Sequence, residues 1–184
     1  MDKYPKPVTK QSTLKILSQI DNSFYKFKNK DEKTGFGFFC TIKYQNENIF
    51  VLVTNYELIN EKYLANNNNT IDILIKDEIK TIEFGNTKYI NKSYDLSIIE
   101  IKQKEIDFVE ILQIDNTLYE KDSEISINNE SIYIIHCSKE NKNCVSYGII
   151  NNENNSYFLL SCNINSNSNG FPIFNLSRNK LIGI

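Results

Sequence analysis

The sequence predicts an all-β fold with one short N-terminal helix. Hydrophobic residues make up 40% of the chain, and Ile, Tyr and Phe, which dominate them, have side chains that suit a half-buried, pleated surface. Helix is disfavoured over most of the 184 residues because the chain contains a single alanine, Ala65. Short apolar runs recur roughly every 8–12 residues between turns rich in Asn, Gly and Lys, which indicates a sandwich or a barrel.

Charge and leader patterns exclude several classes of protein. The formal net charge of −2 provides no strong positive field, so no nucleic-acid partner is expected. The first residues lack the apolar core of a signal peptide, and no apolar run of 18 residues occurs, so neither secretion nor a membrane span is expected. These patterns predict an intracellular (cytoplasmic) protein.

Four cysteines, Cys40, Cys137, Cys144 and Cys162, are too few for a secreted disulfide scaffold and contain no CxxC pair. We expect no metal and mostly buried, free thiols. Cys137 and Cys144 could face each other across a hairpin, but a reducing cytosol would keep them as thiols. Gly35 and Gly37 form a strand pair with no helix after them, so no nucleotide cofactor is implied.

The N-terminal 22 residues are expected to form a basic arm (1–11) and a short amphipathic helix. Leu14, Leu17 and Ile20 provide its apolar spacing, and Ser12 or Thr13 is the predicted N-cap. A single helical turn is expected within residues 58–64.

The remaining chain divides into a first β-barrel at 23–103, an acidic linker at 104–122 and a second β-barrel at 123–184. Within the first barrel, a hairpin is expected around residues 76–78. Strands are predicted at 24–27, 35–44, 49–54, 71–75, 81–84, 96–101, 123–127, 131–136, 144–150, 157–161, 171–174 and 180–184.

Three segments, in order, resemble the trypsin-like (chymotrypsin-fold) serine peptidase family. Residues 35–40 (GFGFFC) and 51–59 (VLVTNYELI) are similar to the strand pair that ends in the catalytic His, and residues 94–99 (YDLSII) are similar to the strand that begins with the catalytic Asp. Residues 167–174 (NSNGFPIF) and 181–184 (LIGI) resemble the nucleophile loop and the strand after it.

This resemblance covers roughly residues 24–184 and implies two β-barrels. It also implies a C-terminally short second barrel, because family members continue beyond the LIGI strand, and a partner chain could complete the open edge.

The resemblance places Glu57 at the His position, Asp95 at the carboxylate and Asn169 at the nucleophilic Ser. An Asn amide cannot form an acyl-enzyme, and neighbouring carboxylates at Glu57 and Asp95 would repel each other instead of relaying a proton. Asn167 replaces the oxyanion-hole Gly, and Phe171 would crowd the loop. The implied member is therefore catalytically degenerate.

Other residues could take over these roles. A shift of one position would present Ser168 as the nucleophile, although Gly170 and Pro172 already align without it. His136, the chain's only histidine, lies in an apolar run and is expected to be a strand residue whose ring is satisfied by a neighbour. The thiols of Cys137 and Cys162 lie outside the loop and are expected to be inert.

The sequence thus predicts a pseudo-protease, a serine protease homologue that acts as a protein-binding or structural module. Its partner would be a protein or an extended peptide added as a strand, which an exposed apolar patch near Tyr56 and Phe171 would favour. Two alternatives remain open. One is an active serine endopeptidase with a non-standard set such as Ser168 and His136, and the other is an unrelated all-β binding module.

Overall fold

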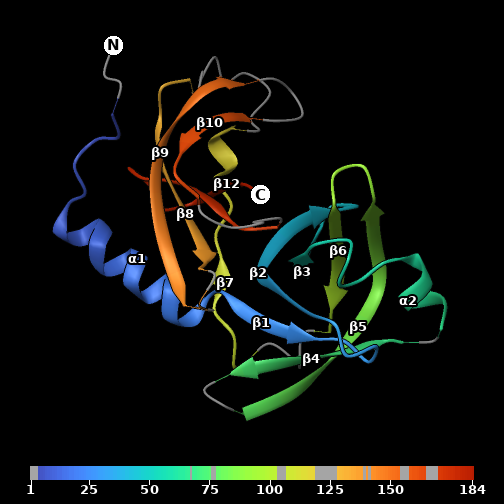
Figure 1. Ribbon diagram of the computed structural model, residues 1–184. Coiled ribbons are helices and arrows are strands. Elements are labelled where there is room, and N and C mark those ends of the chain that lie inside the picture. Colours follow the sequence, from blue (N-terminus) through green and yellow to red (C-terminus); the bar gives the residue numbers. More distant parts are fainter. Residues whose placement is uncertain are drawn as a thin grey trace. The chain divides into compact units, whose positions relative to one another are not determined.

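The chain is described here by a computed structural model that covers residues 4–66, 68–75, 78–102, 107–118, 128–138, 140, 142–153, 158–164 and 170–184. It forms two compact units, each with its own sheet (Figure 1). We call Asp21–Leu112 the N-terminal barrel, and Met1–Ile20 together with Gln113–Ile184 the C-terminal unit. The two units are described separately.

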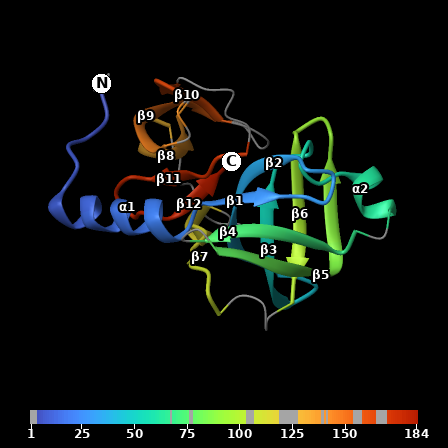
Figure 2. The same cartoon turned by 60° about the horizontal axis from the view of Figure 1, so that its bottom comes forward.

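The N-terminal barrel is one seven-stranded sheet in the order β1-β4-β5-β6-β3-β2-β7. Because β1 also pairs with β2, six of these strands close on themselves, and β7 adds to β2 in parallel (Figures 1 and 2). Its elements are β1 (Tyr25–Lys28), β2 (Thr34–Tyr44), β3 (Glu47–Thr54), α2 (Glu61–Ala65), β4 (Thr70–Ile75), β5 (Glu78–Asn91), β6 (Leu96–Ile101) and β7 (Ile111–Leu112).

Alternating side chains fill this barrel. In β6, every second residue is buried, namely Ser97, Ile99 and Ile101, as expected for a strand with one face on a core. The ring of Phe39 meets the rings of Tyr25 and Phe27 edge-on, with centroids 5.6 and 5.8 Å apart. The aromatic and β-branched composition therefore forms a closed apolar core.

The C-terminal unit contains a five-stranded antiparallel sheet in the order β10-β9-β8-β11-β12. All seven residues of β8 are buried, and Tyr133 on β8 stacks on its cross-strand partner Phe174 with ring centroids 4.8 Å apart. Gly148 lets β10 approach β9, because a Cβ there would lie 2.2 Å from the carbonyl oxygen of Ser161. Its elements are α1 (Lys10–Asn22, which crosses into the barrel at its last two residues), the 3-10 helix η2 (Asn116–Leu118), β8 (Ser131–Cys137), β9 (Asn143–Glu153), β10 (Phe158–Cys162), β11 (Ile173–Asn175) and β12 (Leu181–Gly183).

Helix α1 corrects two expectations. Its N-cap is Thr9, because the Thr9 hydroxyl oxygen accepts a hydrogen bond from the Ser12 N–H at 3.1 Å and the helix begins at Lys10. The predicted apolar face is also wrong. Leu14 and Leu17 are 60% and 51% exposed, and the buried residues are Ser12, Ile16 and Gln19.

Polar bonds explain this orientation of α1. The Gln19 Oε1 accepts a hydrogen bond from the Tyr133 hydroxyl at 2.6 Å, and its Nε2 donates to the Asn179 carbonyl at 3.2 Å. Gln19 is 2% exposed, so both ends of a buried amide are satisfied. Within the preceding arm, the Lys6 N–H donates to the Ser131 hydroxyl at 2.8 Å.

The all-β prediction with a short N-terminal helix is confirmed, and most strands lie where the sequence places them. Strand β5 is longer than the predicted 81–84 and bulges between Phe84 and Lys88. The expected linker contains β7 and η2, and the strand expected at 123–127 lies outside the described residues. The predicted hairpin is the antiparallel pair β4–β5, and the predicted helical turn is α2.

Candidate functional site

The turn after β3 lies against the turn that precedes β6. The Tyr56 N–H donates to Asp95 at two acceptors, to Oδ1 at 3.1 Å and to the carbonyl oxygen at 3.2 Å. Asp95 adopts the left-handed conformation with φ of 49°. The structure therefore brings together the two segments that the sequence predicts to carry the His and Asp positions of a triad.

Buried groups fix the turn that carries Glu57. Leu58 and Ile59, the next two residues, are 1% and 0% exposed and belong to the barrel core. Their carbonyl oxygens accept hydrogen bonds from the side chains of Asn29 (Nδ2, 2.8 Å) and Ser97 (Oγ, 2.5 Å). The turn is thus anchored from within the barrel, independently of the chemistry at Glu57.

Glu57 itself is exposed. Its neighbour Tyr56 donates its hydroxyl to the Glu61 carboxylate, and this bond raises the pKa of Tyr56. The position that would hold an imidazole therefore carries a solvated carboxylate.

Two buried oxygens at this place lack a donor among the described residues, Asp95 Oδ2 and Asn55 Oδ1. A buried acceptor without a partner destabilises the folded state, so it needs an explanation. In a working triad, the carboxylate accepts a hydrogen bond from the imidazole N–H. With glutamate at position 57, a carboxylate oxygen at this site has no such donor.

His136 lies in β8 of the C-terminal unit and is 5% exposed. Its Nε2 is 2.9 Å from the Ser146 Oγ, and that hydroxyl donates to the Asn163 carbonyl at 2.6 Å. Because the hydroxyl proton is committed to Asn163, Nε2 carries the hydrogen and donates to Ser146. The other ring nitrogen, Nδ1, is buried without a partner among the described residues.

The predicted nucleophile positions Asn167, Ser168 and Asn169 lie outside the described residues. Gly170, which follows them directly, has a positive φ of 79°. Phe171 is 7% exposed and its ring lies 6.2 Å from that of His136. The expectation that Phe171 contributes to an exposed apolar patch is therefore wrong, because its side chain is buried.

Comparison with solved structures identifies the architecture. The chain superposes on Deg5 (TM-score 0.61, 14% identity, 97% of this chain and 87% of that chain) and on the inactive form of the Rv3671c protease (TM-score 0.61, 12% identity, 98% and 84%). It also superposes on a serine endoprotease from Yersinia pestis (TM-score 0.62, 15% identity, 97% and 57%). No protein-family model and no curated protein matches the sequence.

The chain has a trypsin-like peptidase fold. At identities of 12–15%, these superpositions establish the fold alone. They favour this fold over the alternative of an unrelated all-β module, and they leave the chemistry to the residues.

None of the four cysteines, all of which lie within the described residues, is in a disulfide; Cys40 and Cys137 are buried, and Cys144 and Cys162 are half-buried. In the β8–β9 ladder, Cys144 pairs with His136 and Cys137 pairs with Asn143. Because successive strand residues point to opposite faces, Cys137 and Cys144 do not face each other, which corrects that expectation.

Burial makes two of these thiols poor nucleophiles. It raises the pKa of Cys40 to about 12, and it also raises the pKa of Cys162. The thiolate is the reactive form, so the raised pKa lowers the reactive fraction of both thiols at neutral pH.

Among the described residues, no cluster of three or more His, Cys, Asp or Glu side chains could hold a metal ion. None of the helices in that part of the chain is long and apolar enough to cross a membrane.

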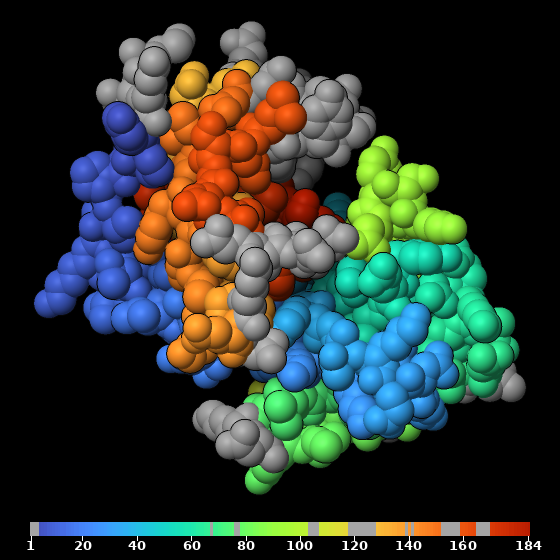
Figure 3. Space-filling model, in the orientation of Figure 1, coloured from blue at the N-terminus to red at the C-terminus, as the bar shows by residue number. Residues whose placement is uncertain are grey.

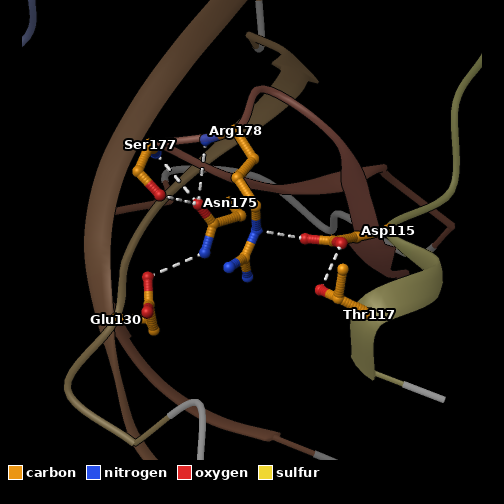
Figure 4. A network of polar contacts seen from close by, with 6 residues as sticks. All are labelled: Asp115, Thr117, Glu130, Asn175, Ser177 and Arg178. Atoms are coloured by element: carbon orange, nitrogen blue, oxygen red, sulfur yellow. Dashed lines mark hydrogen bonds and ion pairs between the residues drawn. The ribbon is translucent and has the colours of Figure 1, made fainter. Parts of the chain in front are cut away.

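Sequence reasoning missed a buried polar network in the C-terminal unit (Figure 4). Asp115, which is 0% exposed, accepts from Arg178 Nε at 2.5 Å and from the Thr117 hydroxyl at 2.7 Å. The Asn175 amide, also fully buried, accepts from the N–H groups of Ser177 and Arg178 and donates to Glu130 at 2.8 Å. The Asn-x-Ser-Arg turn after β11 was its only sequence signal, and the network stabilises that turn.

Proposed function

We propose that this chain is a non-catalytic trypsin-like domain, a pseudo-protease that binds a protein or extended peptide partner or serves as a structural module. The observation that carries the proposal is the position of the single histidine. It belongs to β8, where its Nε2 donates to Ser146, and the N-terminal barrel that holds Asp95 contains no histidine.

A serine mechanism needs an imidazole that takes the nucleophile's proton and a carboxylate that orients it. Here Asp95 has an Oδ2 without a donor among the described residues, and Glu57 is exposed. Asn169 offers no hydroxyl at the position that matches the nucleophile. Each of these features supports loss of hydrolysis rather than its retention.

A non-standard endopeptidase built from Ser168 and His136 is the alternative. For this set, His136 would have to accept the serine proton at Nδ1, a buried atom. His136 would therefore have to be released from its contact with Phe171 or Ser146 before it could act.

Binding does not require a triad. An extended peptide can add to a sheet edge through backbone hydrogen bonds, with alternate side chains giving specificity. The C-terminal sheet has β10 at one edge, where Leu159 is 52% exposed. A partner strand on this edge would gain both ladder bonds and an apolar contact.

The test is hydrolysis of a mixed fluorogenic peptide library by wild type and by the paired variant Glu57→His, Asn169→Ser. We expect wild type to be silent. Turnover in the paired variant would show that the scaffold still supports the reaction, with Glu57→Gln, Asn169→Ala as the matched control without triad chemistry. Cleavage by wild type that follows the protein through purification would overturn the proposal.

A serine-directed covalent probe distinguishes the pseudo-protease from the alternative endopeptidase built from Ser168 and His136. We expect no labelling of wild type, whereas labelling that disappears in Ser168→Ala would establish the non-standard nucleophile. The binding half of the proposal is tested by screening the same peptides, labelled but uncleavable, for association with wild type by fluorescence polarisation. Absence of any bound peptide would favour the structural role.

A further inference from the structure

Helix α1 presents leucines to solvent and polar side chains to the sheet. Leu14 and Leu17 are 60% and 51% exposed, whereas Ser12, Ile16 and Gln19 are buried. Residues three and four apart share one face of a helix, so Leu14 and Leu17 form adjacent parts of one outward surface. Figure 3 shows this segment in blue on the surface of the C-terminal unit.

The orientation of α1 is fixed. If the helix rotated to bury its leucines, Gln19 would lose its bonds to the Tyr133 hydroxyl and the Asn179 carbonyl. Tyr133 is fully buried, so its hydroxyl would be left without a partner, which is costly. The leucines therefore stay outward, and only another molecule that packs on α1 could cover them.

The outward face of α1 carries a charge at each end. Lys10, Leu14, Leu17 and Asp21 follow one another at spacings of four, three and four residues, which keeps them on one face. Both charged residues are exposed. From Lys10 to Asp21 the stripe runs from a cation through two leucines to an anion, and from Asp21 back to Lys10 it runs from an anion through the same two leucines to a cation. It is complementary to itself when two copies lie antiparallel.

We propose that a second copy of this chain covers this stripe, with the two α1 helices packed antiparallel about a two-fold axis. Leu14 then lies against Leu17 of the second copy, and Lys10 lies opposite Asp21 of the second copy. A two-fold interface uses the same patch on both subunits, which a self-complementary stripe satisfies. The inference goes beyond the proposed function and does not depend on it.

The contact is small. A helix of 13 residues is about 20 Å long, so the pair buries less surface than the roughly 1,200–2,000 Å² of a stable interface. The dimer is therefore weak and reversible, and its population rises with protein concentration.

Sedimentation velocity of the full chain, from about 10 μM to about 1 mM at low salt, tests this pairing. We expect a monomer–dimer equilibrium in wild type. Leu14→Gln, Leu17→Gln should lower the association constant by about tenfold or more, because four buried leucines are lost per dimer. Glutamine is a good helix former at these exposed positions, and circular dichroism checks that the fold is kept. Leu74→Gln, another exposed leucine (42% exposed, on β4), is the matched control and should leave association unchanged.

Charge reversal tests the antiparallel geometry. Lys10→Glu alone and Asp21→Lys alone should each weaken self-association, because each places like charges opposite each other. An equimolar mixture of these two variants should associate more strongly than either alone, since both of its facing pairs are then of opposite sign. A wild type that stays monomeric, or a dimer indifferent to both the leucine and the charge variants, would overturn the proposal.

Discussion

The N-terminal barrel and the C-terminal unit satisfy their buried polar groups in different ways. In the barrel, buried polar side chains bond to backbone, as when Asn29 and Ser97 donate to the carbonyls of Leu58 and Ile59. In the C-terminal unit, buried polar side chains also bond to one another, as in the Asp115–Arg178 and Gln19–Tyr133 pairs. The first pattern fixes turns on an apolar core, and the second links separate elements.

Sheet closure accounts for this difference. The barrel pairs β1 with both β4 and β2, so its six closed strands leave no open edge among themselves. Among the described residues, the C-terminal sheet does not close: it runs from β10 to β12, where Leu181 exchanges two backbone hydrogen bonds of 2.8 Å with the segment around Asp115, and it also holds α1. The Gln19–Tyr133 bond attaches α1 to this sheet, and the Asp115–Arg178 pair adds a side-chain bond to a segment that is also paired through its backbone. The barrel should therefore respond most to lost volume, and the C-terminal unit to lost charge.

The largest effect is expected from Phe39→Ala. Phe39 is 0% exposed and contacts two other rings, so its loss leaves a cavity and should lower the free energy of unfolding by about 3–5 kcal/mol. Urea denaturation measures it, with Tyr44→Ala on the exposed end of the same strand as the control. A loss below about 1 kcal/mol would break the assignment of the barrel's stability to its apolar core.

Asp115→Ala is expected to cost about 1–3 kcal/mol, because it removes a fully buried anion and leaves the half-buried Arg178 guanidinium (31% exposed) without its partner. The double variant Asp115→Ala, Arg178→Leu should cost less than the single change, since no unpaired charge remains. Urea denaturation of the two variants measures this coupling. If the double variant is the less stable, the network's packing matters more than its charges, and the contrast between the units weakens.

The smallest effect, when it is measured over one pH unit, is a pH dependence that concerns the barrel. An unfolded thiol has a pKa of about 8.5, whereas burial raises the pKa of Cys40 to about 12. The contribution of Cys40 to stability is therefore complete below about pH 8 and is lost as the pH rises through about 9 towards 12. Wild type should lose stability with pH more steeply than Cys40→Ala, by up to about 1.4 kcal/mol per pH unit.

Urea denaturation at a series of pH values measures this slope, and the same series on Cys162→Ala sharpens the comparison. Cys162 is half-buried in the C-terminal unit, so its removal should change the slope less than that of Cys40. If the free energy of unfolding has the same slope with pH in the two variants, the deeper burial of Cys40 does not make it more important than Cys162 for the pH dependence.

Much of the fold could be predicted from sequence because strand patterns are local. The alternation at 96–101 and the apolar run at 131–136 correspond to β6 and β8. The facing of α1 could not, since Leu14, Leu17 and Ile20 have the spacing of a buried stripe. The deciding contact is between Gln19 and Tyr133, which are 114 residues apart. Long-range polar bonds of this kind leave no periodic signal.

The sequence indicated which two turns of the candidate site lie together, but not the details of their side chains. The motifs around Glu57 and Asp95 belong to two turns that the structure joins through the Tyr56 N–H bond to Asp95. The outward direction of Glu57 depends on how Leu58 and Ile59 enter the core, which neither motif encodes. The pairing of His136 with Ser146 depends on the β8–β9 register, which sequence alone does not fix.

Gly148 has a consequence for how β10 can be aligned. The Ser161 carbonyl occupies the space that a side chain would take at that position. If β10 slid along β9 by two residues, Ser146 or Ile150 would come to this place, and either would collide with that carbonyl. The missing side chain thus selects one alignment out of several that hydrogen bonding alone would accept. The register of β10 on β9 therefore depends on the absence of a side chain at Gly148. It should tolerate changes in the side chains of β10 itself.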